Sequence, residues 1–253
     1  MSVPYAILDP TGNITALMQT ERDAALALDL MRSEPSVEQV GFVRFPRPGE
    51  VEMQMAGGEF CGNATLSAGV LGSEHWGVPE ITVHASGADR PLAVSVTRLE
   101  NGTYDVSGEL PLPERITEER LPLPDGETAL PVVHFPGIAH AIVTGDMSRD
   151  AAERLVKTWC KALRADGMGI LQWEEQARRM TPLVYVPSAD TLFWESSCAS
   201  GTAAVGAWTA LREGKTITLD IKQPGGTLQI TADQSNLHLR ETIRIVKSAV
   251  FAQ

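Results

Sequence analysis

The chain has 253 residues, of which 43% are hydrophobic and 21% charged, and its formal net charge is -11. This composition is typical of a folded globular protein, and it excludes the basic surface that nucleic acids and anionic membranes require. Three cysteines without a CxxC spacing fit neither a secreted disulfide framework nor a structural zinc site. No apolar run has the length of a membrane span and the first residues lack the features of a secretory signal, so we expect a cytoplasmic protein with reduced thiols.

The first half of the chain predicts strands around two helices. Residues 4–18 alternate enough for a strand that is broken at Thr11-Gly12-Asn13, and an Ala- and Leu-rich helix follows over 21–31. A buried helix is predicted after Cys61, because residues 64–71 are small and apolar. The β-rich segments of this half are 40–45, 51–55, 81–85, 92–97 and 104–107.

Residues 110–131 are dense in proline and charge, so we expect no regular element there and place a domain boundary within them. Beyond this segment the same order of elements returns, with a strand over 134–144, a helix over 148–163 and a second cysteine helix. The closing hairpins ITVHASGADRPLAVSV and ITLDIKQPGGTLQITA also match. The repeat predicts two similar α+β domains, 1–115 carrying Cys61 and 116–253 carrying Cys198, with a return of the last strand to the first domain as an alternative.

Both repeated cysteines precede a helix, in GGEFCGNATLSAG and in SSCASGTAAVG. Unpaired N–H groups and the helix dipole favour negative charge at such a position, so we expect deprotonation near neutral pH for Cys61, Cys198 or both. Two thiols that face each other could remove a proton from one side of a stereocentre and return one on the other. The pattern is therefore suited to racemisation.

The phrases TGNIT, EFCGNATLS and ESSCASGTAA resemble those of the diaminopimelate epimerase superfamily over nearly the whole chain. The segments EQVGF, LVYVP and QPGG resemble in particular the histidine racemases of staphylopine-type metallophore pathways. The resemblance implies an α+β fold of two pseudo-symmetric domains, each with a curved, mostly antiparallel sheet around a central helix. It also implies a homodimeric, pyridoxal-independent racemase that uses no cofactor or metal, acts on an amino acid as its small-molecule substrate, and works beside a metallophore synthase.

Site roles follow from the same resemblance. Cys61 and Cys198 match the two catalytic cysteines, one acting as thiolate base and the other as thiol acid. Residues after each cysteine match those that hold the substrate α-carboxylate, and Glu195 matches the acid that meets its ammonium group. The substrate-binding residues implied are Asn13, Gln39, Gly62, Asn63, Glu195, Ser200, Gly201 and Thr202.

Departures from the diaminopimelate enzymes bear on the substrate. Ile138-Ala139-His140, Pro182 and Ser196 stand where those enzymes hold the far end of diaminopimelate, so we expect an ordinary α-amino acid, with L-histidine favoured. Another amino acid, a phenazine-type isomerase and a cysteine-based binding or redox protein stay as alternatives.

Simpler interpretations exist for several residues. Cys160 has no counterpart in the first half and is interpreted as structural. His134 and His140 lie in apolar surroundings and are interpreted as core histidines. Asn13 could serve only its turn, and Glu195 could only favour the dipole of the helix that it precedes.

Overall fold

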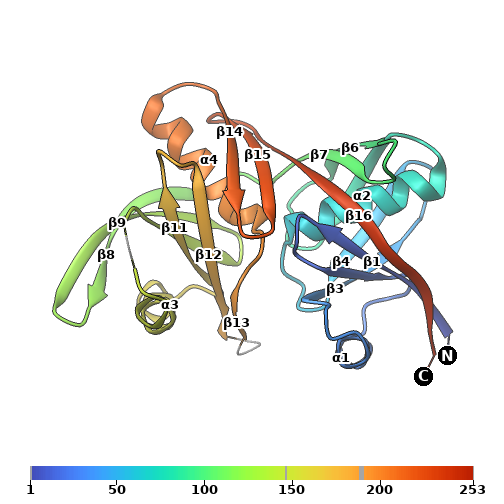
Figure 1. Ribbon diagram of the computed structural model, residues 1–253, viewed down its shortest axis with the longest axis horizontal. Helices are drawn as coiled ribbons and strands as arrows, with labels where there is room; N and C mark the ends of the chain where they lie inside the picture. The colour runs from blue at the N-terminus through green and yellow to red at the C-terminus, as the bar shows by residue number, and fades with distance from the viewer. Residues whose placement is uncertain (1, 146, 188–190, 253) are drawn as a thin grey trace. The chain divides into compact units, whose positions relative to one another are not determined.

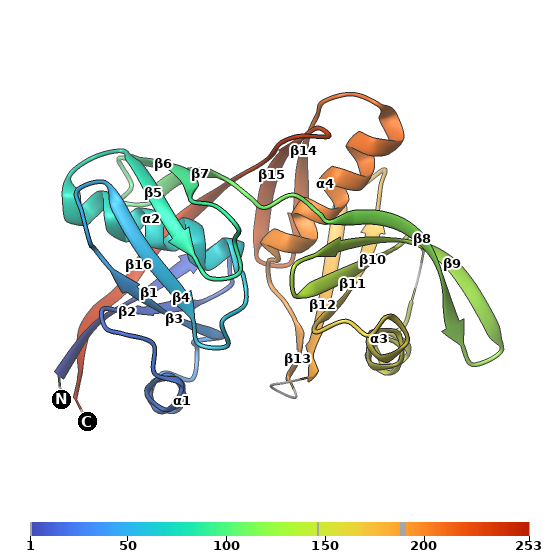
Figure 2. The same ribbon diagram turned by 180° about the vertical axis from the view of Figure 1, so that it is seen from behind.

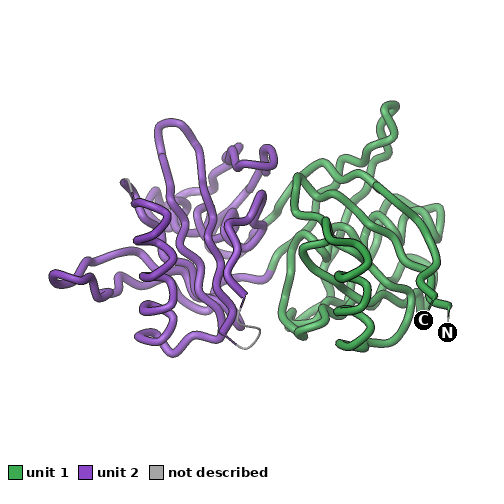
Figure 3. Tube along the Cα trace, turned by 60° about the horizontal axis from the view of Figure 1, so that its bottom comes forward, with its two compact units in different colours: residues 1–110, 238–253 green, residues 111–237 purple. Residues whose placement is uncertain are grey.

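A computed structural model describes residues 2–145, 147–187 and 191–252 (Figure 1). The chain is a mixed α/β protein with a barrel-like sheet and few helices. It divides into two compact units, Met1–Leu110 with His238–Gln253 (unit 1) and Pro111–Leu237 (unit 2) (Figure 3). No helix among the described residues is long and apolar enough to cross a membrane.

The sheet of unit 1 closes on itself. Its strands pair in the order β1-β2-β3-β4-β5-β6-β7-β16, and β16 then pairs antiparallel with β1, from Ser2 opposite Ala252 to Pro10 opposite Ile243. Only β2–β3 and β4–β5 of these pairs are parallel among the described strands. The strands are β1 (Ser2–Pro10), β2 (Thr15–Met18), β3 (Gln39–Arg44), β4 (Glu50–Met55), β5 (Glu80–Ala85), β6 (Leu92–Arg98), β7 (Tyr104–Glu109) and β16 (Leu237–Ala252).

Helix α2 (Gly62–Trp76) forms the core of this barrel. Every residue from Gly62 to Gly72 is buried, and the helix packs against β1, β2 and β4 to β7. A helix buried on all sides needs no polar face, which explains why small and apolar residues fill this stretch. Helix α1 (Ala24–Ser33), capped by Asp23, buries only Leu26, Ala27 and Leu30.

Unit 2 also packs a sheet around a helix that follows a cysteine. Helix α4 (Ala199–Glu213) packs against β9, β10, β14 and β15, and α3 (Arg149–Leu163) packs against β8, β11 and β12. The sheet runs in the order β15-β14-β12-β11-β10-β9-β8, and β13 pairs with β12. Its strands are β8 (Arg115–Leu123), β9 (Gly126–Phe135), β10 (Ile138–Val143), β11 (Met168–Glu174), β12 (Arg179–Val186), β13 (Thr191–Trp194), β14 (Ile217–Gln223) and β15 (Gly226–Ala232).

Helices α2 and α4 match in detail. Each has 15 residues, begins after a cysteine N-cap in extended backbone and ends at a glycine in the left-handed region, with φ of 68° at Gly77 and 66° at Gly214. Glycine is favoured at such a C-cap because it has no Cβ to clash. The repeat seen in the sequence therefore extends to the caps of both helices.

The predicted strands and helices are confirmed, within a few residues at their ends, outside two segments. The single strand predicted over 134–144 is wrong, because a turn at Gly137 separates the end of β9 from β10. The broken first strand is β1 and β2, and the helix predicted over 148–163 is α3 with Ser148 as its N-cap. The absence of regular structure over 110–131 is wrong, because β8 and β9 form a long hairpin there (Figure 2). Pro122 lies in the edge strand β8, and Pro131 lies where β9 pairs only with β8, so both missing N–H groups are tolerated.

Candidate active site

In unit 1 the first predicted catalytic residue, Cys61, is the N-cap of α2. Its φ and ψ are -134° and 113°, and its Sγ accepts a hydrogen bond from the Ala64 N–H at 3.5 Å. The thiol donates to Gln39 Oε1 at 3.2 Å, and Thr65 Oγ1 donates to the Cys61 carbonyl at 2.8 Å. The sulfur thus lies at the helix N-terminus, in line with the sequence pattern, and is only partly buried.

Two further predicted residues lie beside Cys61. Asn13 ends the turn between β1 and β2, in which Thr11 and Gly12 adopt positive φ of 53° and 91°. The Gln39 amide nitrogen donates to Asn13 Oδ1 and, at 2.7 Å, to Thr15 Oγ1, which directs its oxygen to the thiol. The structure therefore brings Asn13, Gln39 and Cys61 together, with Gly62 and Asn63 buried in the first turn of α2.

In unit 2 Cys198 caps α4 in nearly the same conformation, with φ and ψ of -134° and 106°. Its Sγ accepts from the Gly201 N–H at 3.3 Å and lies 3.5 Å from Ser200 Oγ. Thr202 Oγ1 donates to the Cys198 carbonyl at 2.7 Å, as Thr65 does for Cys61. Ser200, Gly201 and Thr202 thus surround this cysteine.

The surroundings of Cys198 favour its thiol form over the thiolate. Burial raises its pKa well above the usual value, and the neighbouring Glu195 carboxylate, which accepts a hydrogen bond from it, raises it further. Hydrogen bonds from Ser200 and Gly201 oppose this shift. At Cys198 desolvation thus opposes the thiolate that the helix N-terminus favours, whereas the expectation of a thiolate at Cys61 stays a prediction.

The sequence did not indicate a role near Cys198 for His140 or Gln223. His140 is fully buried, which lowers its pKa to about 3, and its Nε2 lies 2.9 Å from Ser200 Oγ. Gln223 Oε1 accepts the Cys198 N–H at 2.8 Å, and its Nε2 donates to Thr202 Oγ1 at 2.7 Å. Gln223 stands in the QPGG segment, directly before a turn, which is the one sequence feature that could have drawn attention to it. The sequence around this turn does not show that it contacts α4.

Cys160 and His134, both predicted from the sequence to be structural, make contacts within unit 2. Cys160 is buried on α3 and donates to the Ala165 carbonyl at 3.2 Å, and burial raises its pKa. His134 lies 3.1 Å from Arg115 Nη2 and 3.0 Å from Thr117 Oγ1, both on β8. Within residues 2–145, 147–187 and 191–252, no group of three or more His, Cys, Asp and Glu side chains could hold a metal ion.

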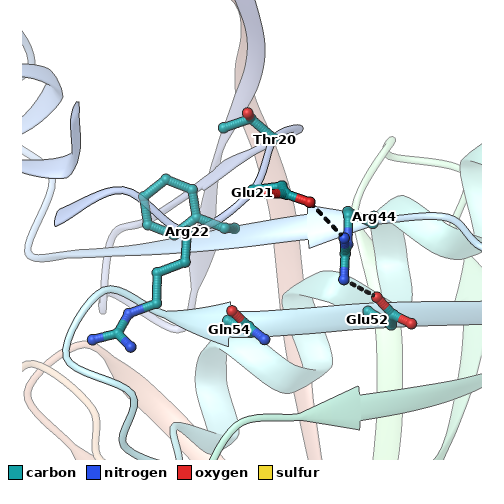
Figure 4. A pocket seen from close by; sticks show the side chains of 7 residues that line it. Thr20, Glu21, Arg22, Arg44, Glu52 and Gln54 are labelled. Carbon is teal, nitrogen blue, oxygen red and sulfur yellow. Dashed lines mark hydrogen bonds and ion pairs between the residues drawn. The ribbon is translucent and has the colours of Figure 1, made fainter.

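An open groove of about 290 Å³ lies on unit 1, and its lining does not include Asn13, Gln39 or Cys61 (Figure 4). Arg44 pairs there with Glu21 at 3.1 Å and with Glu52 at 2.6 Å, and the Arg22 side chain donates to the Ala56 carbonyl at 2.9 Å. Its charges are therefore largely matched within the protein. The lining residues are Thr20, Glu21, Arg22, Phe42, Arg44, Glu52 and Gln54.

Comparison with known proteins identifies the family. The family model described as the histidine racemase CntK N-terminal domain matches residues 2–250. The chain belongs to this family. A histidine racemase of Fusobacterium nucleatum subsp. nucleatum is 28% identical over 94% of this chain and 93% of its own, and one of Staphylococcus aureus is 24% identical over 91% and 88%. Membership of the histidine racemase family makes the chain an isomerase of the racemase class.

Solved structures share the fold. A predicted epimerase of Pseudomonas aeruginosa matches with a TM-score of 0.71 at 12% identity, covering 99% of each chain. A hydroxyproline epimerase of Agrobacterium vitis, with bound trans-4-hydroxy-L-proline, matches with a TM-score of 0.66 at 10% identity, covering 99% of this chain and 91% of its own. A phenazine biosynthesis protein of Enterococcus faecalis matches with a TM-score of 0.63 at 16% identity over both whole chains.

Proposed function

We propose that this chain interconverts L- and D-histidine without a cofactor, with Cys61 and Cys198 as the acid and base. The observation that carries the proposal is the matched placement of two thiols as N-caps of equivalent buried helices, in a chain of the histidine racemase family. One such cysteine could be a small core residue, but a pair with the same cap geometry points to a shared chemical task.

The mechanism is an exchange of protons at one carbon. One cysteine, as thiolate, removes the α-proton and becomes a thiol, leaving a planar carbanion. The other, as thiol, donates its proton to the opposite face and becomes a thiolate. The product has inverted configuration and the two cysteines have exchanged protonation states, so the reverse reaction uses them in reverse order. This scheme requires the two cysteine-bearing units to enclose the substrate between them, as two pseudo-symmetric domains.

The surroundings of Cys198 suggest its role at rest. Cys198 is a thiol, since burial and Glu195 raise its pKa, and it is therefore the proton donor at rest. Cys61 is then the base. When the substrate ammonium binds Glu195, it offsets the carboxylate charge, so the pKa of Cys198 falls and the roles can exchange.

The carbanion and the substrate carboxylate would be stabilised by the first turns of α2 and α4. Free N–H groups at a helix N-terminus bind anions, and donors fixed in advance cost no reorganisation during the reaction. Gly62 and Asn63 in one unit, and Ser200, Gly201 and Thr202 in the other, are the residues assigned to this role. Asn13 and Gln39 would contact the substrate beside Cys61.

Histidine is favoured by the family and by both curated relatives compared above, while another amino acid stays the main alternative. Diaminopimelate is disfavoured because Ile138, Pro182 and Ser196 supply no positively charged partner for a second carboxylate. We also propose a homodimer in the cytoplasm whose D-histidine is consumed in metallophore biosynthesis. A cysteine-based binding or redox protein would hold amino acids without inverting them.

The test is a substrate panel. The purified protein, reduced with a phosphine, is incubated with single L-amino acids, and the enantiomers are separated by chiral chromatography. The proposal predicts that L-histidine approaches an equal mixture of enantiomers, faster than any other amino acid. Racemisation of a different amino acid would reassign the substrate only, whereas inversion of none would remove the racemase proposal.

A further inference from the structure

The turn between β14 and β15 contacts the loop before α4. Gln223, the last residue of β14, accepts the Cys198 N–H at 2.8 Å and donates to Thr202 Oγ1 at 2.7 Å. Two residues later, the Gly225 N–H donates to the Ser196 carbonyl at 2.7 Å. The turn is therefore bonded to the backbone on both sides of Ser197.

The three bonds around Cys198 form a closed ring. Cys198 N–H donates to Gln223, Gln223 donates to the Thr202 hydroxyl, and this hydroxyl donates to the Cys198 carbonyl at 2.7 Å. All three residues are buried, with exposed fractions of 4% for Cys198, 7% for Gln223 and 0% for Thr202. A buried network whose members satisfy one another fixes a single conformation more firmly than its separate bonds would.

Unit 1 also holds the loop before its cysteine by a turn. The corresponding turn, at Ser86 and Gly87, holds the loop before Cys61, because Ser86 Oγ donates to the Glu59 carbonyl at 2.8 Å. Gly87 has a φ of 73°, and a Cβ added there would lie 2.4 Å from the Phe60 nitrogen. The Cys61 thiol bonds the side chain of Gln39. In both units, therefore, the turn of the following hairpin holds the loop that leads to the cysteine.

We propose that Gln223 is a positioning residue for Cys198: its amide clamps the Cys198 backbone and so aims the sulfur at the substrate α-carbon. This inference rests on the proposed function. Because Gly201 N–H reaches the sulfur at 3.3 Å only while the cap geometry holds, loss of the clamp also weakens the stabilisation of the Cys198 thiolate. Gln223 acts through Cys198 and needs no contact with the substrate.

The experiment compares Gln223→Leu and Gln223→Glu with wild type. Leucine removes both bonds, whereas glutamate keeps an acceptor for Cys198 N–H but cannot donate to Thr202. The matched control is Gln229→Leu, since Gln229 lies on the next strand and donates only to Asp220 at 2.8 Å among the bonds of the described residues. Two readouts are taken: α-proton exchange of histidine, and the pH dependence of iodoacetamide alkylation at each cysteine by peptide mass spectrometry.

The proposal predicts that kcat falls by about tenfold to a hundredfold in both Gln223 variants with KM within about twofold, because small misplacements of a reacting group carry such costs. The measured pKa of Cys198 rises, while that of Cys61 and the behaviour of Gln229→Leu stay as in wild type. Equal shifts at both cysteines, or wild-type behaviour in both variants, would overturn it. If wild type itself exchanges no proton, the proposed function fails. The alkylation profile does not depend on turnover, so it still shows whether Gln223 affects Cys198.

Discussion

At the residue scale, the pKa of Cys198 depends on three opposing influences. A helix N-terminus favours the thiolate, but complete burial and the Glu195 charge favour the thiol, and the latter two prevail. The sequence pattern alone left open which of the two cysteines is the thiolate. Burial of one particular sulfur is a property of the whole fold, so a local motif cannot reveal it.

Replacing Glu195 by Gln tests this balance. Removal of the carboxylate charge should lower the pKa of Cys198, so that alkylation by iodoacetamide becomes faster at each pH at which the wild-type thiol is still protonated. Histidine exchange should become slower, because the substrate ammonium group loses its proposed partner. The rates at Cys61 serve as the internal control. An unchanged alkylation profile at Cys198 would show that Glu195 does not set its protonation state.

Glu241 on β16 gives a prediction for stability. It is buried, and desolvation with a contribution from Asp9 raises its pKa to about 8, against an opposing hydrogen bond from Thr11. An acid with a raised pKa in the folded state contributes fully below its unfolded value, 4.5, and this contribution is lost as pH rises towards 8. Glu241→Gln should therefore gain stability relative to wild type between these values.

The gain is a few kcal/mol at most, since one pKa unit corresponds to about 1.4 kcal/mol. Urea denaturation at pH 5 and pH 8 measures it, with the exposed Glu118→Gln as control. A difference between Glu241→Gln and wild type that does not grow with pH would contradict the assignment.

At the element scale, the buried helices depend on close approach to their strands. A Cβ added at Gly69 in α2 would lie 2.4 Å from Val94 Cγ1, so no side chain fits there without a shift of β6. Gly69→Ala should destabilise the protein by about 1–3 kcal/mol, the usual cost of overpacking. The double variant Gly69→Ala with Val94→Ala should lose less stability, measured by urea denaturation, than the sum of the losses of the two single variants. Strict additivity would mean that the two residues do not interact.

Element order could largely be predicted from the sequence, because hydrophobic periodicity and the repeat around Cys61 and Cys198 are local signals. The hairpin of β8 and β9 could not, since its prolines are tolerated only because of which strands lie beside it. Its anchoring is also non-local: Leu121 packs in the unit 2 core, and Trp159 Nε1 donates to the Pro122 carbonyl at 2.8 Å.

At the scale of the whole molecule, closure of the unit 1 barrel joins the two ends of the chain, with Ser2 opposite Ala252. The sequence pattern of two such distant segments does not show that they pair, nor which residues lie opposite each other. The same limit applies to the site: residues in one motif could be grouped, but the contacts of Gln39 with Cys61 and of Gln223 with Cys198 depend on pairing across the fold.

The proposed chemistry needs only the protein and its substrate. Exhaustive dialysis against EDTA, or treatment with hydroxylamine to remove pyridoxal phosphate, should leave histidine exchange within experimental error of the untreated protein. Iodoacetamide should abolish it. Activity that is lost on dialysis and restored by a metal or a cofactor would require a different mechanism.

The central claim is that two thiols exchange the α-proton, and deuterium incorporation into histidine in D₂O tests it most directly. Wild type, Cys61→Ala, Cys198→Ala and Cys160→Ala are compared under reducing conditions. The two-cysteine mechanism predicts exchange in wild type and Cys160→Ala, and a loss of at least about a hundredfold in Cys61→Ala and in Cys198→Ala, as expected when an acid or base is removed. Full exchange in Cys61→Ala or Cys198→Ala would contradict the two-cysteine mechanism.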